Sequence, residues 1–301
     1  MSRPRVLVTG AAGFIARTLV PRLVEHADVT LLLREKFGSS RTLPPQLSQV
    51  RARVETVVAD LRDYQLTAHA LRQARPERVI HLAAVGVSDP FLDVNVALAH
   101  NVIGTLNLVR ACFEGNGPEV QQLIVARTPG ECTAMNIYAA SKAAAWSFCQ
   151  MYSNTAGWPI HGAMIYQAYG SDQPSHMLIP AALRMAKSGE DFPMTSGAQK
   201  KDWVHVDDVC AGIVSLLGTD LPPGTTVELG TGIATSVREI VEQLYAIVGR
   251  GGRPIPGALL DRPGEETEQY ADAESTATQI GWRAAISLTE GLTGLANNPS
   301  Q

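Results

Sequence analysis

The 301-residue sequence is poor in several kinds of residue, and each shortage argues against a class of protein. Its four cysteines, Cys112, Cys132, Cys149 and Cys210, form no Cys-x-x-Cys pair, which favours buried thiols in a reducing compartment over disulfides or a metal site. Basic residues do not outnumber acidic ones, 25 against 29, so a general binder of nucleic acid or anionic membrane is a poor fit. No run comes near the roughly 18 uninterrupted apolar residues of a membrane-spanning helix, and we expect a cytoplasmic protein.

What the sequence does contain is a regular alternation of short apolar runs and helical patterns. We expect strands at 5–9, 28–33, 54–59, 78–82, 122–126 and 160–165, and helices at 13–25, 64–74, 93–114 and 138–155. Strands that are apolar almost throughout, alternating with helices, predict an α/β fold with a Rossmann doubly wound parallel sheet covered on both faces.

The regularity breaks after Tyr169-Gly170. Helices are expected at 177–187, 206–217 and 237–248 and a short strand at 227–229, separated by loop-like segments, with an irregular stretch at 251–264. We interpret residues 1–168 as a dinucleotide-binding domain, with returns to it at about 204–230. Residues 169–301 are then a smaller, interleaved C-terminal substrate-binding lobe.

The first strand ends in a glycine turn, Thr9-Gly10-Ala11-Ala12-Gly13-Phe14-Ile15-Ala16. Gly10 allows a tight turn. Gly13 lets the backbone approach a pyrophosphate at the N-terminus of the next helix, where unpaired N–H groups and the helix dipole favour an anion. On the first strand of a βαβ pattern this turn predicts a dinucleotide site that includes Gly10, Ala12, Gly13, Phe14 and Ile15, the alternative being an ordinary glycine turn.

The end of the second strand distinguishes the two nicotinamide dinucleotides. An acidic residue there would accept a hydrogen bond from the adenosine ribose and favour NAD, but the strand ends in Leu32-Leu33-Arg34, and Asp28 lies at its start. A guanidinium at position 34 can pair with a 2′-phosphate, so the pattern favours NADP(H). The alternative is a solvated Arg34 with NAD(H) as the cofactor.

Two further strand ends complete the expected cofactor site. Asp60 is placed to accept from the adenine amino group, with Leu61 beside it, and a helix N-cap is the alternative for this carboxylate. The small residues of Leu82-Ala83-Ala84 allow the backbone to run against the cofactor. We interpret His81 as a core histidine.

A proton-transfer pair follows the fifth strand. Tyr138 and Lys142 stand four residues apart at the start of a helix, so the phenol and the ammonium point the same way. A nearby cation is expected to lower the pKa of the tyrosine, which could then exchange a proton with a carbonyl or hydroxyl oxygen. Thr128 is the candidate for orienting that oxygen, with Thr133 ranked second. The alternative for Tyr138 and Lys142 is a pair of solvated side chains.

Together these motifs resemble the extended short-chain dehydrogenase/reductase family, and within it the NAD(P)-dependent nucleotide-sugar epimerase, dehydratase and reductase group. The resemblance covers almost the whole chain. Its motifs are the glycine turn, Asp60-x-Arg62, His81-Leu82-Ala83-Ala84, Asn101-x-x-Gly104-Thr105, Tyr138-x-x-x-Lys142, Tyr169-Gly170, Asp202-Trp203-Val204-His205-Val206-Asp207-Asp208, Leu229-Gly230-Thr231-Gly232 and Arg262-Pro263-Gly264-Glu265.

The resemblance implies roles for particular residues. Thr128, Tyr138 and Lys142 would be the catalytic triad, with Tyr138 and Lys142 also holding the cofactor. Lys201 and Arg262 would meet the diphosphate of a nucleotide sugar, and Gln167 would lie in the sugar site. The alternatives are a solvated pair of Lys200 and Lys201, and a loop ion pair of Arg262 with Glu265 or Glu266. The family also implies a homodimer formed by the helices at 93–114 and 138–155.

Several residues depart from the family pattern. The strand end is Ala126-Arg127-Thr128 rather than serine-rich, and the connection from Thr128 to Tyr138 is short. Pro129-Gly130 stands where sugar 4,6-dehydratases carry an acidic pair, which argues against dehydratase chemistry, although Glu131 could still reach the site. Gln167 and Met164 replace residues that contact the sugar in the family.

Three functions follow from these observations. The first is an NADP(H)-dependent oxidoreductase that reduces the 4-ketone of a nucleotide-linked 4-keto-6-deoxyhexose with Tyr138 as general acid. The second is an NAD-dependent nucleotide-sugar 4-epimerase. The third is a dinucleotide-sensing protein without turnover, which the presence of both Tyr138 and Lys142 disfavours.

Overall fold

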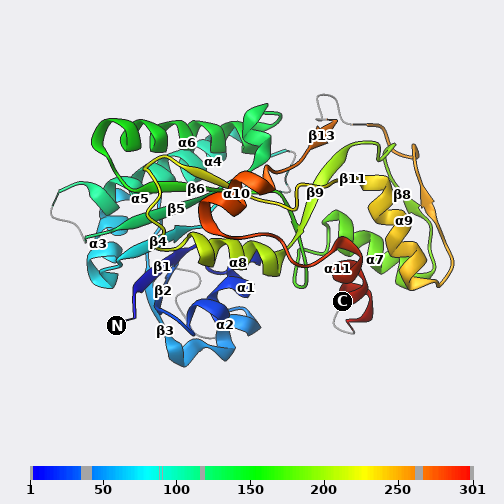
Figure 1. The fold of residues 1–301 in the computed structure, drawn as a ribbon, viewed down its shortest axis with the longest axis horizontal. Helices are drawn as coiled ribbons and strands as arrows, with labels where there is room; N and C mark the ends of the chain where they lie inside the picture. The colour runs from blue at the N-terminus through cyan, green and yellow to red at the C-terminus, as the bar shows by residue number, and fades with distance from the viewer. Residues whose placement is uncertain are drawn as a thin grey trace. The chain divides into compact units, whose positions relative to one another are not determined.

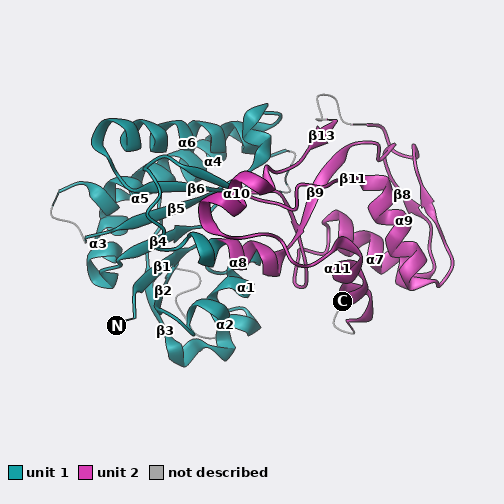
Figure 2. Ribbon diagram, in the orientation of Figure 1, with its two compact units in different colours: residues 1–164, 213–227 teal, residues 165–212, 228–301 magenta. Residues whose placement is uncertain are grey.

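The computed structural model describes residues 3–34, 43–87, 89, 91–115, 119–261 and 267–298. The chain divides into two compact units (Figure 2). Unit 1 takes residues 1–164 and 213–227, and unit 2 takes residues 165–212 and 228–301. Each unit has a hydrophobic core of its own.

The sheet of seven strands that runs through unit 1 has the order β10-β6-β5-β4-β1-β2-β3 (Figure 1). From β3 to β6 every neighbouring pair is parallel, which confirms the predicted doubly wound sheet. The strand order reverses between β1 and β4, and ligands bind at such switch points in open α/β sheets. The strands are β1 (Arg5–Thr9), β2 (Asp28–Leu33), β3 (Val54–Val58), β4 (Arg78–His81), β5 (Gln122–Arg127), β6 (Ile160–Ile165) and β10 (Thr226–Leu229).

Helices cover both faces of this sheet. In Figure 1, α5 and α6 lie on one side of it and α1 on the other. The helical elements of unit 1 are α1 (Phe14–Leu23), α2 (Pro45–Gln49), η3 (Arg51–Arg53), α3 (Tyr64–Ala74), α4 (Val94–Ala97), η4 (Leu98–Ile103), α5 (Gly104–Phe113), η5 (Pro129–Cys132) and α6 (Ile137–Ala156).

The core of unit 1 explains why these helices form where they do. Leu71 of α3 and Leu108 of α5 are fully buried in one cluster with Leu7 and Leu123 of the sheet. Val8, on the opposite face of β1, is equally buried, so both sides of the sheet are withdrawn from water. This two-sided burial is the reason that the strands read as nearly continuous apolar runs.

The helix predicted at 93–114 is built in three consecutive parts. α4 and α5 are α-helical, and η4 between them is one turn of π-helix. The stretch Val94–Phe113 is the one described helix that is long and apolar enough to cross a membrane by length and composition, and 56% of its best window is buried inside the protein. More than half of this window is thus covered by the protein. Core helices that are mostly buried also meet the length and composition criteria for a membrane-spanning helix.

Unit 2 is built on a small sheet around β9, with β7 and β11 among its neighbours. Its strands are β7 (Gln167–Tyr169), β8 (Phe192–Pro193), β9 (Lys200–His205), β11 (Ala234–Ser236), β12 (Pro254–Ile255) and β13 (Glu268–Gln269). Its helices are α7 (Leu178–Ser188), α9 (Val237–Val248), α10 (Ala273–Ile280) and α11 (Leu288–Asn297), and α8 (Val206–Leu216) spans the boundary between the units.

The loop expected before residue 206 is wrong, because β9 is the central strand of this sheet. Its polar start, Lys200-Lys201-Asp202, hides the strand in the sequence. Asp202 is fully buried, and its carboxylate accepts from the N–H groups of Gly232 and Ala271 at 2.8 and 3.1 Å and from both donors of Thr231. A buried carboxylate satisfied in this way is tolerated inside a strand.

Candidate active site

The glycine turn joins β1 to α1 with a backbone that only glycine tolerates. Gly10 has φ +66°, and the N–H of Gly13 donates to the Gly10 carbonyl at 2.8 Å. A Cβ on Gly10 would lie 2.6 Å from the backbone N of Ala83 and 2.7 Å from the carbonyl carbon of Leu82. The first turn of α1 holds no acidic residue, so no carboxylate competes with an anion there.

A cavity of about 300 Å³ opens beside this turn at the carboxyl ends of β1, β2, β3 and β4. Most of the residues predicted to hold the cofactor line it: Gly10, Ala12, Gly13, Arg34, Asp60, Leu61, Leu82, Ala83 and Ala84. Four predicted cofactor residues are not among those that line the cavity: Phe14 and Ile15, which begin α1, and Tyr138 and Lys142 of α6. The walls also include residues that the sequence analysis did not assign to it: Ala11, Leu32, Leu33, Ala59, Val85 and His100.

This cavity fits a nicotinamide dinucleotide. The cavity wall near the glycine turn consists of small residues and of backbone. At position 10 there is no space for a side chain, because a Cβ would clash with backbone of Leu82 and Ala83. The N-terminus of α1 suits a pyrophosphate, and the apolar walls suit an adenine. The residues that would hold the group are those of the glycine turn together with Arg34, Asp60 and Leu61.

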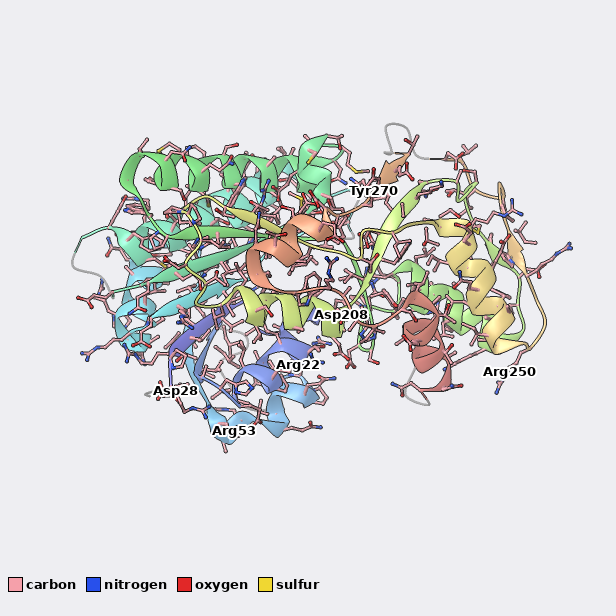
Figure 3. The ribbon with its side chains drawn as sticks, viewed as in Figure 1. Arg22, Asp28, Arg53, Asp208, Arg250 and Tyr270 are labelled. Carbon is pink, nitrogen blue, oxygen red and sulfur yellow. The ribbon has the colours of Figure 1, made fainter. Side chains whose placement is uncertain are left out.

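The two charged residues of β2 lie at opposite ends of the strand. Asp28, labelled in Figure 3, begins β2 and accepts from Arg3 Nε at 3.1 Å. Arg34 follows the last residue of β2, is exposed, and lines the cavity. Among the described residues, the charged side chain at this strand end that lines the cavity is therefore a cation.

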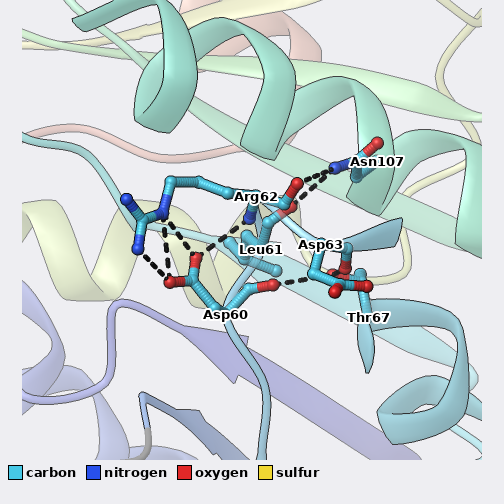
Figure 4. A network of polar contacts seen from close by, with 6 residues as sticks. All are labelled: Asp60, Leu61, Arg62, Asp63, Thr67 and Asn107. Atoms are coloured by element: carbon cyan, nitrogen blue, oxygen red, sulfur yellow. Dashed lines mark hydrogen bonds and ion pairs between the residues drawn. The ribbon is translucent and has the colours of Figure 1, made fainter. Parts of the chain in front are cut away.

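Asp60 on the cavity wall is paired with Arg62 (Figure 4). Arg62 donates from Nε to both carboxylate oxygens at 3.0 Å, and this guanidinium lowers the pKa of Asp60 to about 2. The N-cap alternative for Asp60 is wrong, because Asp63 accepts from the N–H of Leu66 and caps α3. Asp60 thus keeps its negative charge at any physiological pH.

His81 is a core histidine, as the sequence predicted. Thr105 Oγ1 donates to the Asn101 carbonyl at 2.7 Å, so it accepts from His81 Nε2 at 2.9 Å. Nδ1 then accepts from Thr9 Oγ1 at 2.7 Å. Burial, with a smaller contribution from the charge of Lys142, lowers the pKa of His81 to about 3. The imidazole is neutral and serves as a bridge between β1, β4 and α5.

The π turn η4 brings two side chains to the site. Asn101 accepts from the N–H of Val85 at 2.9 Å and donates to Ser141 Oγ on α6 at 2.9 Å, which ties the cavity wall to that helix. His100 lines the cavity, and partial burial together with the charge of Arg62 lowers its pKa. The sequence analysis missed His100 because the extra residue of a π turn leaves no mark in helical periodicity.

Tyr138 and Lys142 lie one turn apart near the start of α6. Lys142 is only 4% exposed, and burial lowers its pKa while Glu131 opposes that effect. The expectation that the pKa of Tyr138 is lowered is wrong: burial raises it, and the carboxylate of Glu131 raises it further. The phenol therefore stays protonated at neutral pH, which suits a proton donor.

Thr128 follows the end of β5 and caps η5. Its N–H donates to Glu131 Oε1 at 3.0 Å, so the carboxylate fixes the main chain that carries the threonine hydroxyl. Thr133 is the C-cap of η5, and its hydroxyl donates to the Gly130 carbonyl at 3.5 Å. Glu131 does not reach into an open site, because its side chain is 2% exposed and paired with Arg127.

The residues predicted to bind substrate belong to unit 2. Gln167 is partly buried in β7 and lies opposite Trp203 in the sheet. Lys201 in β9 donates from Nζ to Gln269 Oε1 at 3.0 Å, whereas Lys200 is the exposed member of the lysine pair. Arg262 lies outside the described residues.

A glycine turn at the switch point, a dinucleotide cavity and a Tyr-Lys pair on α6 define the class of the protein. It is an enzyme of the extended short-chain dehydrogenase/reductase group. A model of the NAD dependent epimerase/dehydratase family matches residues 6–230, and the chain belongs to that family.

Relatives similar in sequence align with almost the whole chain. The UDP-glucose 4-epimerase of Mycolicibacterium smegmatis is 30% identical over 312 residues, which cover 96% of each protein. The dTDP-glucose 4,6-dehydratase of Neisseria gonorrhoeae is 24% identical over 329 residues, covering 96% of this chain and 94% of the relative.

Solved structures agree in fold. The dTDP-glucose 4,6-dehydratase DesIV of Streptomyces venezuelae, with NAD and TYD bound, superposes with TM-score 0.82 and 26% identity over 97% of this chain and 95% of that one. The UDP-glucose 4-epimerase of Thermus thermophilus in complex with NAD gives TM-score 0.80 and 26% identity over 97% and 98%. The cofactor class is therefore a nicotinamide dinucleotide.

Replacing Gly10 by alanine tests whether the glycine turn binds the dinucleotide. We expect Gly10→Ala to weaken dinucleotide binding by at least about 100-fold, since the Cβ meets backbone of Leu82 and Ala83 and the turn must shift. Isothermal titration calorimetry with NADH and NADPH measures this loss. Gly157→Ala is the matched control, because Gly157 has the same φ of +66° and nothing within 4 Å of its Cβ position. Equal affinities in the two variants would contradict the assignment.

Proposed function

We propose that the protein is an NADP(H)-dependent oxidoreductase that reduces the 4-ketone of a nucleotide-linked 4-keto-6-deoxyhexose. The observation that carries the proposal is the arrangement after Thr128: Pro129 and Gly130 replace an acidic pair, and Glu131 is buried in an ion pair with Arg127. Within the described segment 128–132 the carboxylate is thus not free to act as a base for elimination of water, and the protonated phenol of Tyr138 is the proton donor.

The chain's own residues would carry out the proton transfer. A bound nicotinamide dinucleotide supplies the hydride for a ketone carbon. Tyr138 gives its phenol proton to the ketone oxygen, and Thr128 donates a hydrogen bond that orients the same oxygen. Lys142 holds the ribose hydroxyls and stabilises the phenolate left after proton transfer, which a buried ammonium does more strongly than a solvated one.

A nucleotide sugar is the substrate class that fits the relatives, whose names include a UDP-glucose 4-epimerase and a dTDP-glucose 4,6-dehydratase. Lys201 and Arg262 would pair with its diphosphate, and Gln167 would contact the sugar. The second candidate function is a nucleotide-sugar 4-epimerase, which the 30% identity to such an enzyme favours. The third function expected from the sequence, a binding protein without turnover, does not agree with membership of this enzyme family or with the presence of both Tyr138 and Lys142.

Turnover tests the main proposal. When the enzyme is mixed with NADPH and a nucleotide 4-keto-6-deoxyhexose, we expect NADPH to be consumed. The fall in NADPH absorbance measures the rate. Tyr138→Phe should lower kcat by about 10²- to 10⁴-fold with little change in KM, since it removes general-acid catalysis but keeps the ring. If wild type consumes no more NADPH than this variant, the reductase assignment fails. Tightly held NAD that survives dialysis, with interconversion of nucleotide hexoses, would establish the epimerase instead.

Arg34 tests the choice of dinucleotide. We expect Arg34→Ala to weaken NADPH binding by about 10- to 100-fold, the worth of one charge-assisted hydrogen bond to a phosphate, and to leave NADH affinity within about threefold. Calorimetric titrations of both dinucleotides measure the ratio. Arg72→Ala, an exposed arginine of α3 that does not line the cavity, is the control. Parallel losses for NADH and NADPH in Arg34→Ala would refute an NADP preference.

We also propose a homodimer. Large apolar side chains are exposed along two helices that pack on each other: Val94, Val96, Leu98, Ile103, Ile137, Phe148 and Met151. Exposed apolar side chains gathered on neighbouring helices are typical of an interface between copies. Phe148→Asp should raise the dimer dissociation constant at least about tenfold in analytical ultracentrifugation. Leu66→Asp, equally exposed on α3, should not. A monomeric wild type would rule the dimer out.

A further inference from the structure

A buried ion pair joins the end of β5 to η5. Arg127 Nε donates to Glu131 Oε2 at 2.8 Å, and the two side chains are 14% and 2% exposed. Taking two charges out of water is costly unless both are held in good geometry with further hydrogen bonds. The surroundings of this pair meet that requirement on both sides.

Arg127 is held by two other elements. Its Nη1 donates to Thr226 Oγ1 at 2.8 Å, at the start of β10. Its guanidinium carbon lies 4.4 Å from the ring centroid of Trp146, which belongs to α6. Arg127 therefore ties β5 to β10 and to the helix that carries Tyr138 and Lys142, and a lysine could not make the same forked and stacked contacts.

Glu131 uses both carboxylate oxygens. Oε2 accepts from Arg127, and Oε1 accepts from the N–H of Thr128 at 3.0 Å. An anion held in this way cannot swing out to act as a base on substrate, but its charge extends to its neighbours. It raises the pKa of Tyr138 and that of Lys142.

Glu131 opposes the effects that lower the pKa of Lys142. Burial is the main cause that lowers the pKa of Lys142, and the guanidinium of Arg127 lowers it too, whereas Glu131 and the thiol of Cys149 act in the opposite direction. The charge of Lys142 in turn lowers the pKa of His81, which burial already keeps neutral. Glu131 thus acts on the ammonium of Lys142 from a distance, while its direct ion pair is with Arg127.

We propose that Glu131, clamped by Arg127, is a positioning residue that fixes the main chain of Thr128 and holds its buried negative charge at a fixed place behind the Tyr138 and Lys142 pair. This proposal rests on the proposed roles of Thr128, Tyr138 and Lys142. It assigns a use to Arg127, which stands in the strand end that departs from the serine-rich pattern of the family, and to Glu131, which follows it.

Glu131→Gln tests the proposal, since the amide oxygen can still accept from Thr128 while the charge is lost. Without that charge Tyr138 and Lys142 both lose protons more easily, so the alkaline limb of kcat/KM should move to lower pH by about one unit, a tenfold change in proton affinity. KM should stay within about threefold across this pH range. Glu131→Asp should restore part of the alkaline limb.

A second readout does not depend on turnover. The ultraviolet difference spectrum between each protein and its Tyr138→Phe partner reports the titration of the Tyr138 phenol, and in Glu131→Gln this titration should also move to lower pH. If Glu131→Gln does not fold, the double variant Arg127→Gln, Glu131→Gln removes both charges. The lost guanidinium then offsets part of the effect on Lys142, but the pKa of Tyr138, which Glu131 raises, should still move to lower pH in the tyrosinate titration.

The matched control is Glu290→Gln, which changes an exposed carboxylate that accepts from the N–H of the Ser287 cap of α11. It should leave both titrations unchanged. A lower melting temperature in Glu131→Gln with unchanged pH profile and tyrosinate titration would overturn the proposal and leave the ion pair a purely structural role. Full activity of Tyr138→Phe would instead refute the proposed function, while the spectroscopic titration would still decide whether Glu131 controls the phenol.

Discussion

The close approach of Gly10 to the end of β4 is the constraint on which the site depends. The backbone of β1 turns at φ +66° directly against Leu82 and Ala83, at a distance where no Cβ fits. This contact brings the carboxyl ends of β1 and β4 together at the point where the strand order reverses. The turn and α1 can then present backbone N–H groups to a pyrophosphate, which a bulkier residue at position 10 would displace.

Much of the fold could be predicted from the sequence because unit 1 repeats one simple pattern. β1, β2 and β6 begin and end at the expected residues, since a strand buried on both faces is an uninterrupted apolar run. Two features escaped that reasoning. β9 starts with polar residues whose partners lie far away in the chain, as the donors to Asp202 show, and η4 adds a π turn inside a helix whose periodicity looks regular.

In the candidate site, too, the sequence predicts some properties and not others. Spacing alone places Tyr138 and Lys142 on one helical face, and strand ends alone place Arg34 and Asp60 at the cavity. The charge state of the tyrosine is a different kind of property, because it depends on burial and on Glu131, a residue whose orientation the sequence does not reveal. The general lesson is that sequence predicts which groups meet, whereas desolvation decides in which direction their pKa values move.

A chain of hydrogen bonds connects the glycine turn to the proton donor. Thr9 donates to His81, which donates to Thr105, which donates to the carbonyl of Asn101. The side chain of Asn101 then donates to Ser141, whose hydroxyl donates to the carbonyl of Tyr138 at 2.7 Å. Each member is buried or partly buried and satisfied, so displacing any one of them leaves a polar group without a partner in a low-dielectric core. The backbone that binds the dinucleotide and the helix that carries the acid are therefore held in one register by neutral groups, and the buried charges of Lys142, Glu131 and Arg127 lie beside this network without interrupting it.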